Sequence, residues 1–127
     1  MSGAGPPPRS FLDIRANYAD DQEIGILMDA RSTCIDGDTL LHRAALAGNR
    51  QDVRDLVALG ADPNAAGDMG NTPLHYAASS GHLLVVLTLL ECGAASRAKN
   101  DFGQTPADCA GLAKHFQLEG VLRSSRK

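Results

Sequence analysis

Residues 70–78 of this chain read Gly-Asn-Thr-Pro-Leu-His-Tyr-Ala-Ala, and the same pattern occurs twice more at an interval of 33 residues. The earlier copy, residues 37–45, reads Gly-Asp-Thr-Leu-Leu-His-Arg-Ala-Ala, and the later copy, residues 103–111, reads Gly-Gln-Thr-Pro-Ala-Asp-Cys-Ala-Gly. A second pattern keeps the same interval, because the leucine and Gly-Ala positions of residues 56–61 recur in residues 89–94. A period shared by two separate motifs indicates a chain built from repeated structural units.

Each unit has the signals of a turn followed by two short helices. In the second unit, Gly70 suits a turn, and Thr72 followed by Pro73 is suited to the N-cap and first position of a helix. Gly81 and Gly93 are placed to end the first and second helices of that unit. Between these signals apolar residues recur at helical spacing, so each helix has one face to bury.

The chain resembles the ankyrin-repeat family in residues 72–82, which read TPLHYAASSGH, and in residues 89–94, which read LLECGA. The resemblance implies an all-α solenoid of stacked helix-turn-helix units, with hairpin loops that project from the stack. It also implies a concave surface, formed by the hairpin tips and the inner helices, that binds another protein. In the last unit Asp108 stands where the second has His75, so a histidine bond between units is not expected there.

The chain divides into five expected segments. Residues 35–67 and 68–100 are expected to be two full repeats, and residues 101–127 a C-terminal capping repeat. Residues 10–34 lack the motif but contain apolar residues spaced for a degenerate pair of helices, which we expect to cap the N-terminal end. Residues 1–9, rich in glycine and proline, are expected to be disordered.

The composition fits one globular domain and does not favour nucleic acid or membrane as a partner. Hydrophobic residues make up 43% and charged residues 21% of the 127 residues, the formal net charge is -3, and no long basic block is present. The longest apolar run, residues 83–87, is too short to cross a bilayer. The three cysteines form no disulfide framework, so we expect free thiols and a cytoplasmic or nuclear protein.

The sequence offers no catalytic or metal-binding motif. His42 and His75 recur at the repeat interval, so we expect each to bond the backbone of a neighbouring unit. His82 and His115 have no second ligand at the spacing that zinc requires. The chain has neither a nucleophile motif nor a phosphate-binding loop. We therefore expect no enzyme activity, no metal and no cofactor.

A partner can be recognised at positions whose identity the repeat leaves free, on the hairpin tips and the first helix of each unit. The candidate partner-binding residues are Asp36, Asp38, Arg43, Leu46, Asp68, Met69, Asn71, Tyr76, Ser79, Ser80, Lys99, Asp101, Phe102, Gln104 and Leu112. Met69 and Phe102 occupy the same tip position in adjacent units, where exposed apolar side chains would anchor a partner. The alternative is that the tips fold back on each other.

A second candidate surface lies on the outer helices. Gln51 and Arg54 of the first unit are replaced by Leu84 and Leu87 in the second, and the two leucines share one side of a helix. Either they form a second contact surface, such as a homodimer interface, or a flanking part of the chain covers them.

Together these features predict a small non-catalytic adaptor, or a regulatory or inhibitory subunit, that binds another protein. The alternative function is a structural subunit or assembly factor of a larger complex, held through Leu84 and Leu87. We expect a monomer, with a homodimer as the alternative state.

Overall fold

The computed structural model describes residues 10–18, 29–34 and 37–125, and the regular structure in these residues is helical. The α-helices are α1 (Phe11–Arg15), α2 (Leu40–Ala47), α3 (Arg50–Ala58), α4 (Pro73–Ser80), α5 (Leu83–Glu91), α6 (Pro106–Leu112) and α7 (Phe116–Ser124). The 3-10 helices of the described residues are η1 (Ala16–Tyr18), which follows α1, and η3 (Asp68–Gly70), which precedes α4. The predicted all-α class is confirmed.

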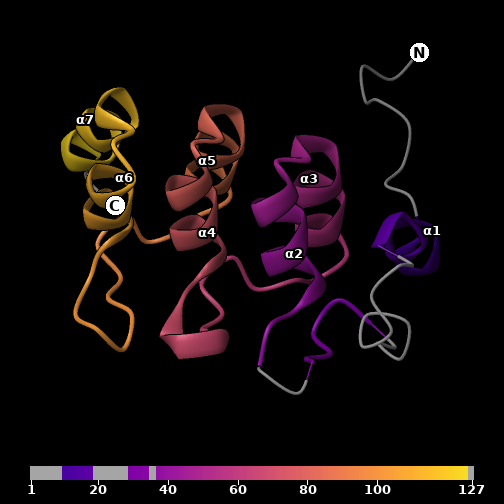
Figure 1. Ribbon diagram of the computed structural model, residues 1–127. Coiled ribbons are helices and arrows are strands. Elements are labelled where there is room, and N and C mark those ends of the chain that lie inside the picture. Colours follow the sequence, from indigo (N-terminus) through magenta and orange to yellow (C-terminus); the bar gives the residue numbers. More distant parts are fainter. Residues whose placement is uncertain (1–9, 19–28, 35–36, 126–127) are drawn as a thin grey trace, which may run out of the picture.

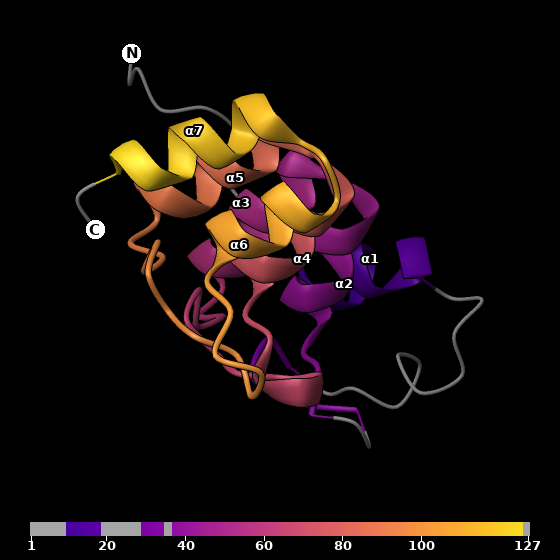
Figure 2. The same cartoon turned by 60° about the vertical axis from the view of Figure 1, so that its left-hand side comes forward.

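The helices from α2 onward form three pairs that stand side by side (Figure 1). Helices α2, α4 and α6 form an inner row, and α3, α5 and α7 form an outer row (Figure 2). The loops that precede α4 and α6 project from the same edge of the stack, the lower edge in Figure 1. This arrangement is the predicted solenoid of stacked helix-turn-helix units.

The motif residues begin and end the inner helices as predicted. Thr72 is the N-cap of α4: its hydroxyl accepts a hydrogen bond from the N–H of His75, and Nδ1 of His75 accepts one from the N–H of Thr72. Gly48 and Gly81 follow α2 and α4 in the left-handed conformation, with φ of 78° and 77°. In the third pair Lys114 adopts this conformation, with φ of 67°, which is uncommon for a residue other than glycine.

Small and branched apolar side chains fill the space between the helix pairs. Ala44, Ala77 and Ala110 of the inner row are fully buried, and their small size allows α2, α4 and α6 to pack closely. Leu56 and Leu89 of the outer row are also fully buried. Burial of one leucine side chain contributes about 2 kcal/mol. Because the main contacts between the inner helices join neighbouring pairs, stability depends on the stacking of the pairs.

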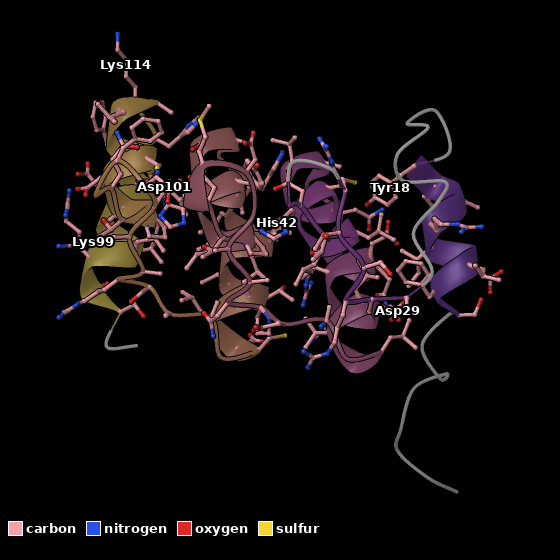
Figure 3. The ribbon with its side chains drawn as sticks, turned by 90° about the horizontal axis from the view of Figure 1, so that it is seen from below. Tyr18, Asp29, His42, Lys99, Asp101 and Lys114 are labelled. Atoms are coloured by element: carbon pink, nitrogen blue, oxygen red, sulfur yellow. The ribbon has the colours of Figure 1, made fainter. Side chains whose placement is uncertain are left out.

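The N-terminal part of the described chain packs on the first helix pair. Ile14 of α1 is fully buried, and the hydroxyl of Tyr18 donates a 2.8 Å hydrogen bond to Oδ2 of Asp52 in α3. Nδ2 of Asn17 lies 3.3 and 3.4 Å from the two oxygens of the same buried carboxylate. Figure 3 shows Tyr18 between α1 and the first pair.

The helix pair predicted in residues 10–34 is described only in its first half. Helix α1 supplies the first helix, and Ser10 caps it by accepting the N–H of Asp13 at 3.2 Å. The apolar residues 24–28, which were expected to form the second helix, lie outside the described residues, as do residues 1–9.

Candidate protein-binding surface

The hairpin loops share one pattern of backbone bonds and contact each other at their tips. In the loop before α4, the N–H of Gly67 donates to the carbonyl of Asn71 at 2.8 Å, and the loop before α6 has the same bond at 2.9 Å. The N–H of Asp101 in the third loop donates to the carbonyl of Met69 in the second at 3.0 Å. The tips therefore form a row along one edge of the stack.

Met69 and Phe102, the two predicted anchors, expose their side chains at these tips. Their exposed fractions are 54% and 65%, so contact between the tips leaves both side chains accessible. Met69 has a φ of 55°, in the left-handed region that residues other than glycine seldom adopt. A strained residue that exposes a large apolar side chain is typical of a functional site.

Asp38, which was predicted to face a partner, is buried beneath the tips, with 2% of its surface exposed. Its carboxylate accepts hydrogen bonds from the hydroxyl of Tyr76 at 3.0 and 3.1 Å and from the N–H of Asp68 at 2.9 Å. Nη2 of Arg43 lies 4.0 Å from the same carboxylate. The hydroxyl of Tyr76 and Nη2 of Arg43, which belong to two further candidates, thus face Asp38 within the protein. An isolated aspartate is usually exposed, and here the neighbouring loop overrides that tendency.

Asn71, also predicted to contact a partner, joins the second loop to the third, and Gln104, another candidate, is bonded within the third loop. Nδ2 of the buried Asn100 donates to Oδ1 of Asn71 at 2.9 Å and to Oε1 of Gln104 at 3.1 Å. These bonds hold the loops in a fixed relation, so the two residues support the tips through internal contacts.

The other candidates lie on the surface, are half-buried or fall outside the described residues. The exposed candidates are Leu46, Met69, Ser79, Lys99, Asp101, Phe102 and Leu112. Asp68 and Ser80 are half-buried, and Asp36 lies outside the described residues. Lys99 and Asp101 stand at the C-terminal end of the row of tips (Figure 3), and Leu46, Ser79 and Leu112 occupy the far ends of the inner helices.

His42 and His75 link neighbouring helix pairs, as predicted. Because the N–H of Thr72 donates to Nδ1 of His75 at 3.1 Å, Nδ1 is an acceptor and Nε2 carries the ring proton. Nε2 then donates to the carbonyl of Gln104 at 2.8 Å, in the loop of the third pair. Nε2 of His42 makes equivalent contacts at 2.9 and 3.0 Å with two carbonyls of the second loop.

Stability should decrease as the pH falls through the usual pKa of histidine. Burial lowers the pKa of His75 below the usual value for histidine, although its backbone hydrogen bonds oppose this shift. The unfolded chain therefore binds the proton more readily, and acid favours unfolding. We expect the free energy of unfolding, measured with urea, to decrease between about pH 7.5 and pH 5. A His75→Gln variant should lose less over this interval, and an equal loss would assign the dependence to other groups.

A second pair of histidines between helix pairs was not predicted. His82 and His115 also stand 33 residues apart, and their rings lie against Gly48 and Gly81, where an added Cβ would come within 2.7 Å of ring atoms. Nε2 of His82 lies 3.0 Å from the carbonyl of Leu46 in the preceding pair. The interval of 33 residues between them was the sequence signal that could have predicted this role, because residues at the repeat interval occupy equivalent packing positions in neighbouring pairs.

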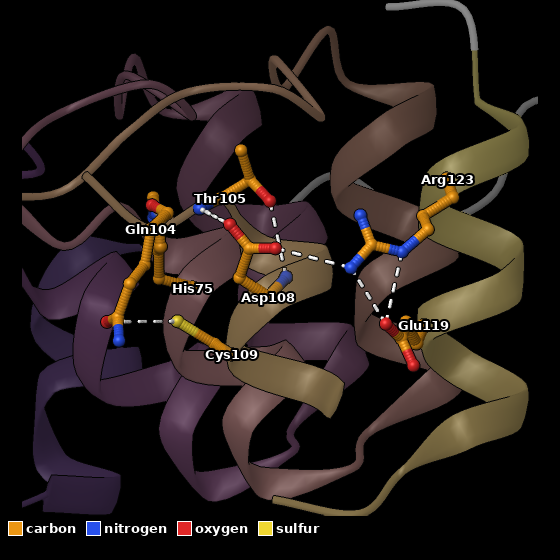
Figure 4. A network of polar contacts seen from close by, with 7 residues as sticks. All are labelled: His75, Gln104, Thr105, Asp108, Cys109, Glu119 and Arg123. Atoms are coloured by element: carbon orange, nitrogen blue, oxygen red, sulfur yellow. Dashed lines mark hydrogen bonds and ion pairs between the residues drawn. The ribbon is translucent and has the colours of Figure 1, made fainter. Parts of the chain in front are cut away.

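The C-terminal end of the stack carries a network of charged side chains (Figure 4). Asp108 stands at the position of His75, and its Oδ2 accepts the N–H of Thr105 at 3.0 Å. Its Oδ1 lies 3.2 Å from Nη2 of Arg123, which also contacts Oε2 of Glu119 at 2.8 Å. The backbone bond from Thr105 lowers the pKa of Asp108, and Arg123 lowers it further. Asp108 thus retains the capping role of the histidine.

The described residues show neither an activated thiol at Cys92 or Cys109 nor a metal-binding cluster. Burial raises the pKa of Cys92 and of Cys109, which disfavours the nucleophilic thiolate. Within the described ranges no three His, Cys, Asp or Glu side chains are grouped closely enough to hold a metal ion. The helices seen there are also too short or too polar to cross a membrane.

Comparison with known families agrees with this architecture. A family model of ankyrin repeats, in three copies, matches residues 16–100 and 41–118. The chain belongs to the ankyrin-repeat family, whose repeats are generally protein-protein interaction modules. None of the curated proteins compared with the chain matches it.

Proposed function

We propose that the chain is a small non-catalytic adaptor, or a regulatory or inhibitory subunit, that binds another protein through its hairpin tips and inner helices. The observation that carries the proposal is the exposure of Met69 and Phe102 at adjacent tips. Burial of both side chains against a partner would contribute about 3 kcal/mol. Lys99 and Asp101 lie beside them and can orient the partner through charge.

The bonds between the loops support this function because they order the tips before a partner arrives. Asp38 fastens the second loop to the first, and Asn100 fastens the third to the second. Little conformational entropy would therefore be lost when a partner docks. Leu46 and Leu112, at the far ends of the inner helices, extend the accessible apolar surface across the inner row.

We propose that residues 10–34 and 101–127 act as the N-terminal and C-terminal caps of the solenoid. Terminal units of a repeat stack need a polar outer face to remain soluble. At the C-terminal end, Asp108, Glu119 and Arg123 supply charged groups that pair with one another. At the other end, Tyr18 bonds the buried carboxylate of Asp52 and holds α1 against α3.

We propose a cytoplasmic or nuclear location and a protein as the binding partner. The thiols of Cys34, Cys92 and Cys109 form no disulfide bond, as is usual in a reducing compartment. The formal net charge of -3 does not favour nucleic acid, whose binding depends on neutralising phosphates with basic residues.

Replacing both anchors, Met69→Ala with Phe102→Ala, should weaken partner binding about thirtyfold or more, equivalent to about 2 kcal/mol. Affinity capture with wild-type protein from its native cell extract identifies a partner, and calorimetry with that purified partner gives the affinity of each form. The melting curve should not change, because both side chains are exposed.

Met69→Gly is the matched control for backbone conformation. It removes the side chain but accommodates the left-handed φ of 55° without strain, so it should bind as weakly as Met69→Ala and be no less stable. Wild-type affinity in the double alanine variant, with an unchanged melting curve, would show that the tips do not carry binding.

A further inference from the structure

A hollow of about 430 Å³, which we call the end hollow, lies at the C-terminal end of the stack. Its lining includes Ser96, Arg97 and Lys99 of the loop before α6, together with Ala107, Leu122 and Arg123 of α6 and α7. The alanine and the leucine are buried, whereas Arg97 and Lys99 are exposed. Leu84 and Leu87, predicted as a second contact surface, are exposed on α5 and do not line the end hollow.

The equivalent place at the start of the stack is partly filled by a neighbouring segment of the chain. A hollow of about 140 Å³ there is lined by four residues that stand two repeat intervals before Ser96, Arg97, Lys99 and Thr105, namely Ala30, Arg31, Thr33 and Thr39. The rest of that lining includes Asp62, Ala65 and Ala66 of the non-helical segment 62–66. In the described chain no segment takes this position beside the end hollow, which is correspondingly larger.

The middle of the stack shows how a side chain at the position of Arg97 binds such a segment. Asn64 stands one repeat interval before Arg97. Its Nδ2 donates to the carbonyl of Gly93 at 3.2 Å, and its Oδ1 accepts the N–H of Ala95 at 2.7 Å. The guanidinium of Arg97 has several N–H donors at the same position, so it is suited to carbonyl and carboxylate oxygens.

The charged side chains that line the end hollow are basic. Among its lining residues three are cations and none is a carboxylate, although the formal net charge of the chain is -3. Arg123 contacts Oε2 of Glu119 at 2.8 Å and Oδ1 of Asp108 at 3.2 Å (Figure 4). Arg97 and Lys99, in contrast, form no ion pair with another described residue. Their charges are therefore available to an incoming anion.

Neither the rest of this loop nor the sequence after α7 supplies the missing negative charge. Asp101, the next carboxylate along the loop, lies against Gly70 of the second loop, where an added Cβ would overlap its Oδ1. The two residues that follow Ser125 in the sequence are Arg126 and Lys127, and both are basic. The charge of the end hollow is thus complementary to an acidic group from another molecule.

We propose that the end hollow binds a non-helical, acidic segment of a partner protein. The segment takes the position that residues 62–66 have at the start of the stack, and its carboxylates contact Arg97 and Lys99. Lys99 is three residues from Phe102 in the third loop, so one partner can contact both the end hollow and the hairpin tips. The proposal rests on the proposed function for the presence of a partner protein. The added contact favours partners with an acidic segment and accelerates their association.

Titration of the full chain with a peptide, followed through the NMR chemical shifts of its backbone amides, tests this contact. The probe is acetylated and amidated Gly-Ala-Asp-Pro-Asp-Ala-Asp-Gly, which follows residues 60–67 but has aspartate at the positions of Asn64 and Ala66. The comparison peptide has asparagine in place of each aspartate. The acidic probe should shift the amides of residues 96–99 and 105 and bind about tenfold or more tightly than the comparison peptide. Its affinity should decrease at high salt.

Arg97→Gln with Lys99→Gln should weaken binding of the acidic probe about tenfold or more. The melting curve should not change, because both side chains are exposed. Arg54→Gln with Lys114→Gln is the matched control, since it removes two positive charges from exposed positions that do not line the end hollow. This control should bind the probe like the wild type.

Equal binding of the two peptides overturns the proposal, as does equal weakening by the two charge variants. Stronger shifts of the same amides by a short oligothymidylate also overturn it, because they would assign the end hollow to the phosphates of nucleic acid. Met69→Ala with Phe102→Ala should bind the probe like the wild type, because neither residue lines the end hollow. Binding by the hairpin tips is measured separately with the captured partner, so failure of the probe to bind leaves that function standing.

Discussion

Replacing Gly67 with alanine is expected to lower the free energy of unfolding by about 3 kcal/mol or more. The new Cβ would overlap Oδ1 of Asp38 and lie 2.8 Å from Nε2 of His42. Both side chains are buried and held by their own hydrogen bonds, Asp38 by the hydroxyl of Tyr76 and the N–H of Asp68. To make room, the carboxylate must move and break bonds, and each buried polar group left without its partner costs about 1–3 kcal/mol.

Urea denaturation of Gly67→Ala measures this loss, and Gly120→Ala is the matched glycine control. At Gly120 the added methyl group meets no described atom within 4 Å, so stability should stay constant or increase. In an Asp38→Ala background the overlapping oxygen is absent, and Gly67→Ala should then cost at least about 1 kcal/mol less. A loss below about 1 kcal/mol in the wild-type background would show that Asp38 moves aside without penalty.

The requirement at Gly67 shows why some features could be predicted from the sequence and others could not. The helices were predictable because their signals are local: Thr72 and Pro73 begin α4, and Gly81 follows its end. Gly67 has an ordinary φ of -110°, and the corresponding positions in the other units hold Cys34 and Asn100. The requirement arises from contact between loops, which no local rule or repeat interval describes.

The candidate site likewise has some features that could be predicted from the sequence and others that could not. The exposure of Met69 and Phe102 was predictable, because an apolar residue at a projecting tip has few neighbours in its own unit. Asp38 was not predictable as a buried residue, because its partner Tyr76 lies 38 residues later in the chain. A polar side chain at a tip can bond either a partner or the adjacent loop, and only the three-dimensional arrangement distinguishes the two.

His75 connects the second and third helix pairs through both nitrogens of one buried ring. Nδ1 accepts the N–H of Thr72 in its own pair, and Nε2 donates to the carbonyl of Gln104 in the next loop. The side chain is 1% exposed, so truncation leaves both backbone groups in a site that water reaches poorly. In the third pair Asp108 replaces only the first of these bonds, which is sufficient where no further helix pair is described.

We therefore expect His75→Ala to lower the free energy of unfolding by about 3 kcal/mol, since two backbone groups lose their partners and a cavity forms. Because each pair is stabilised by its neighbours, amide hydrogen exchange should accelerate more in α6 and α7 than in α2 and α3. His75→Gln keeps an amide that can bond one of the two groups, so its loss should be smaller. Phe102→Ala, which removes an exposed side chain of the third loop, is the control and should leave both measurements unchanged.

Wild-type stability in His75→Ala would show that the ring does not hold the third pair. Equal acceleration in every helix would show that the chain unfolds as one unit, without a separate response of its C-terminal end.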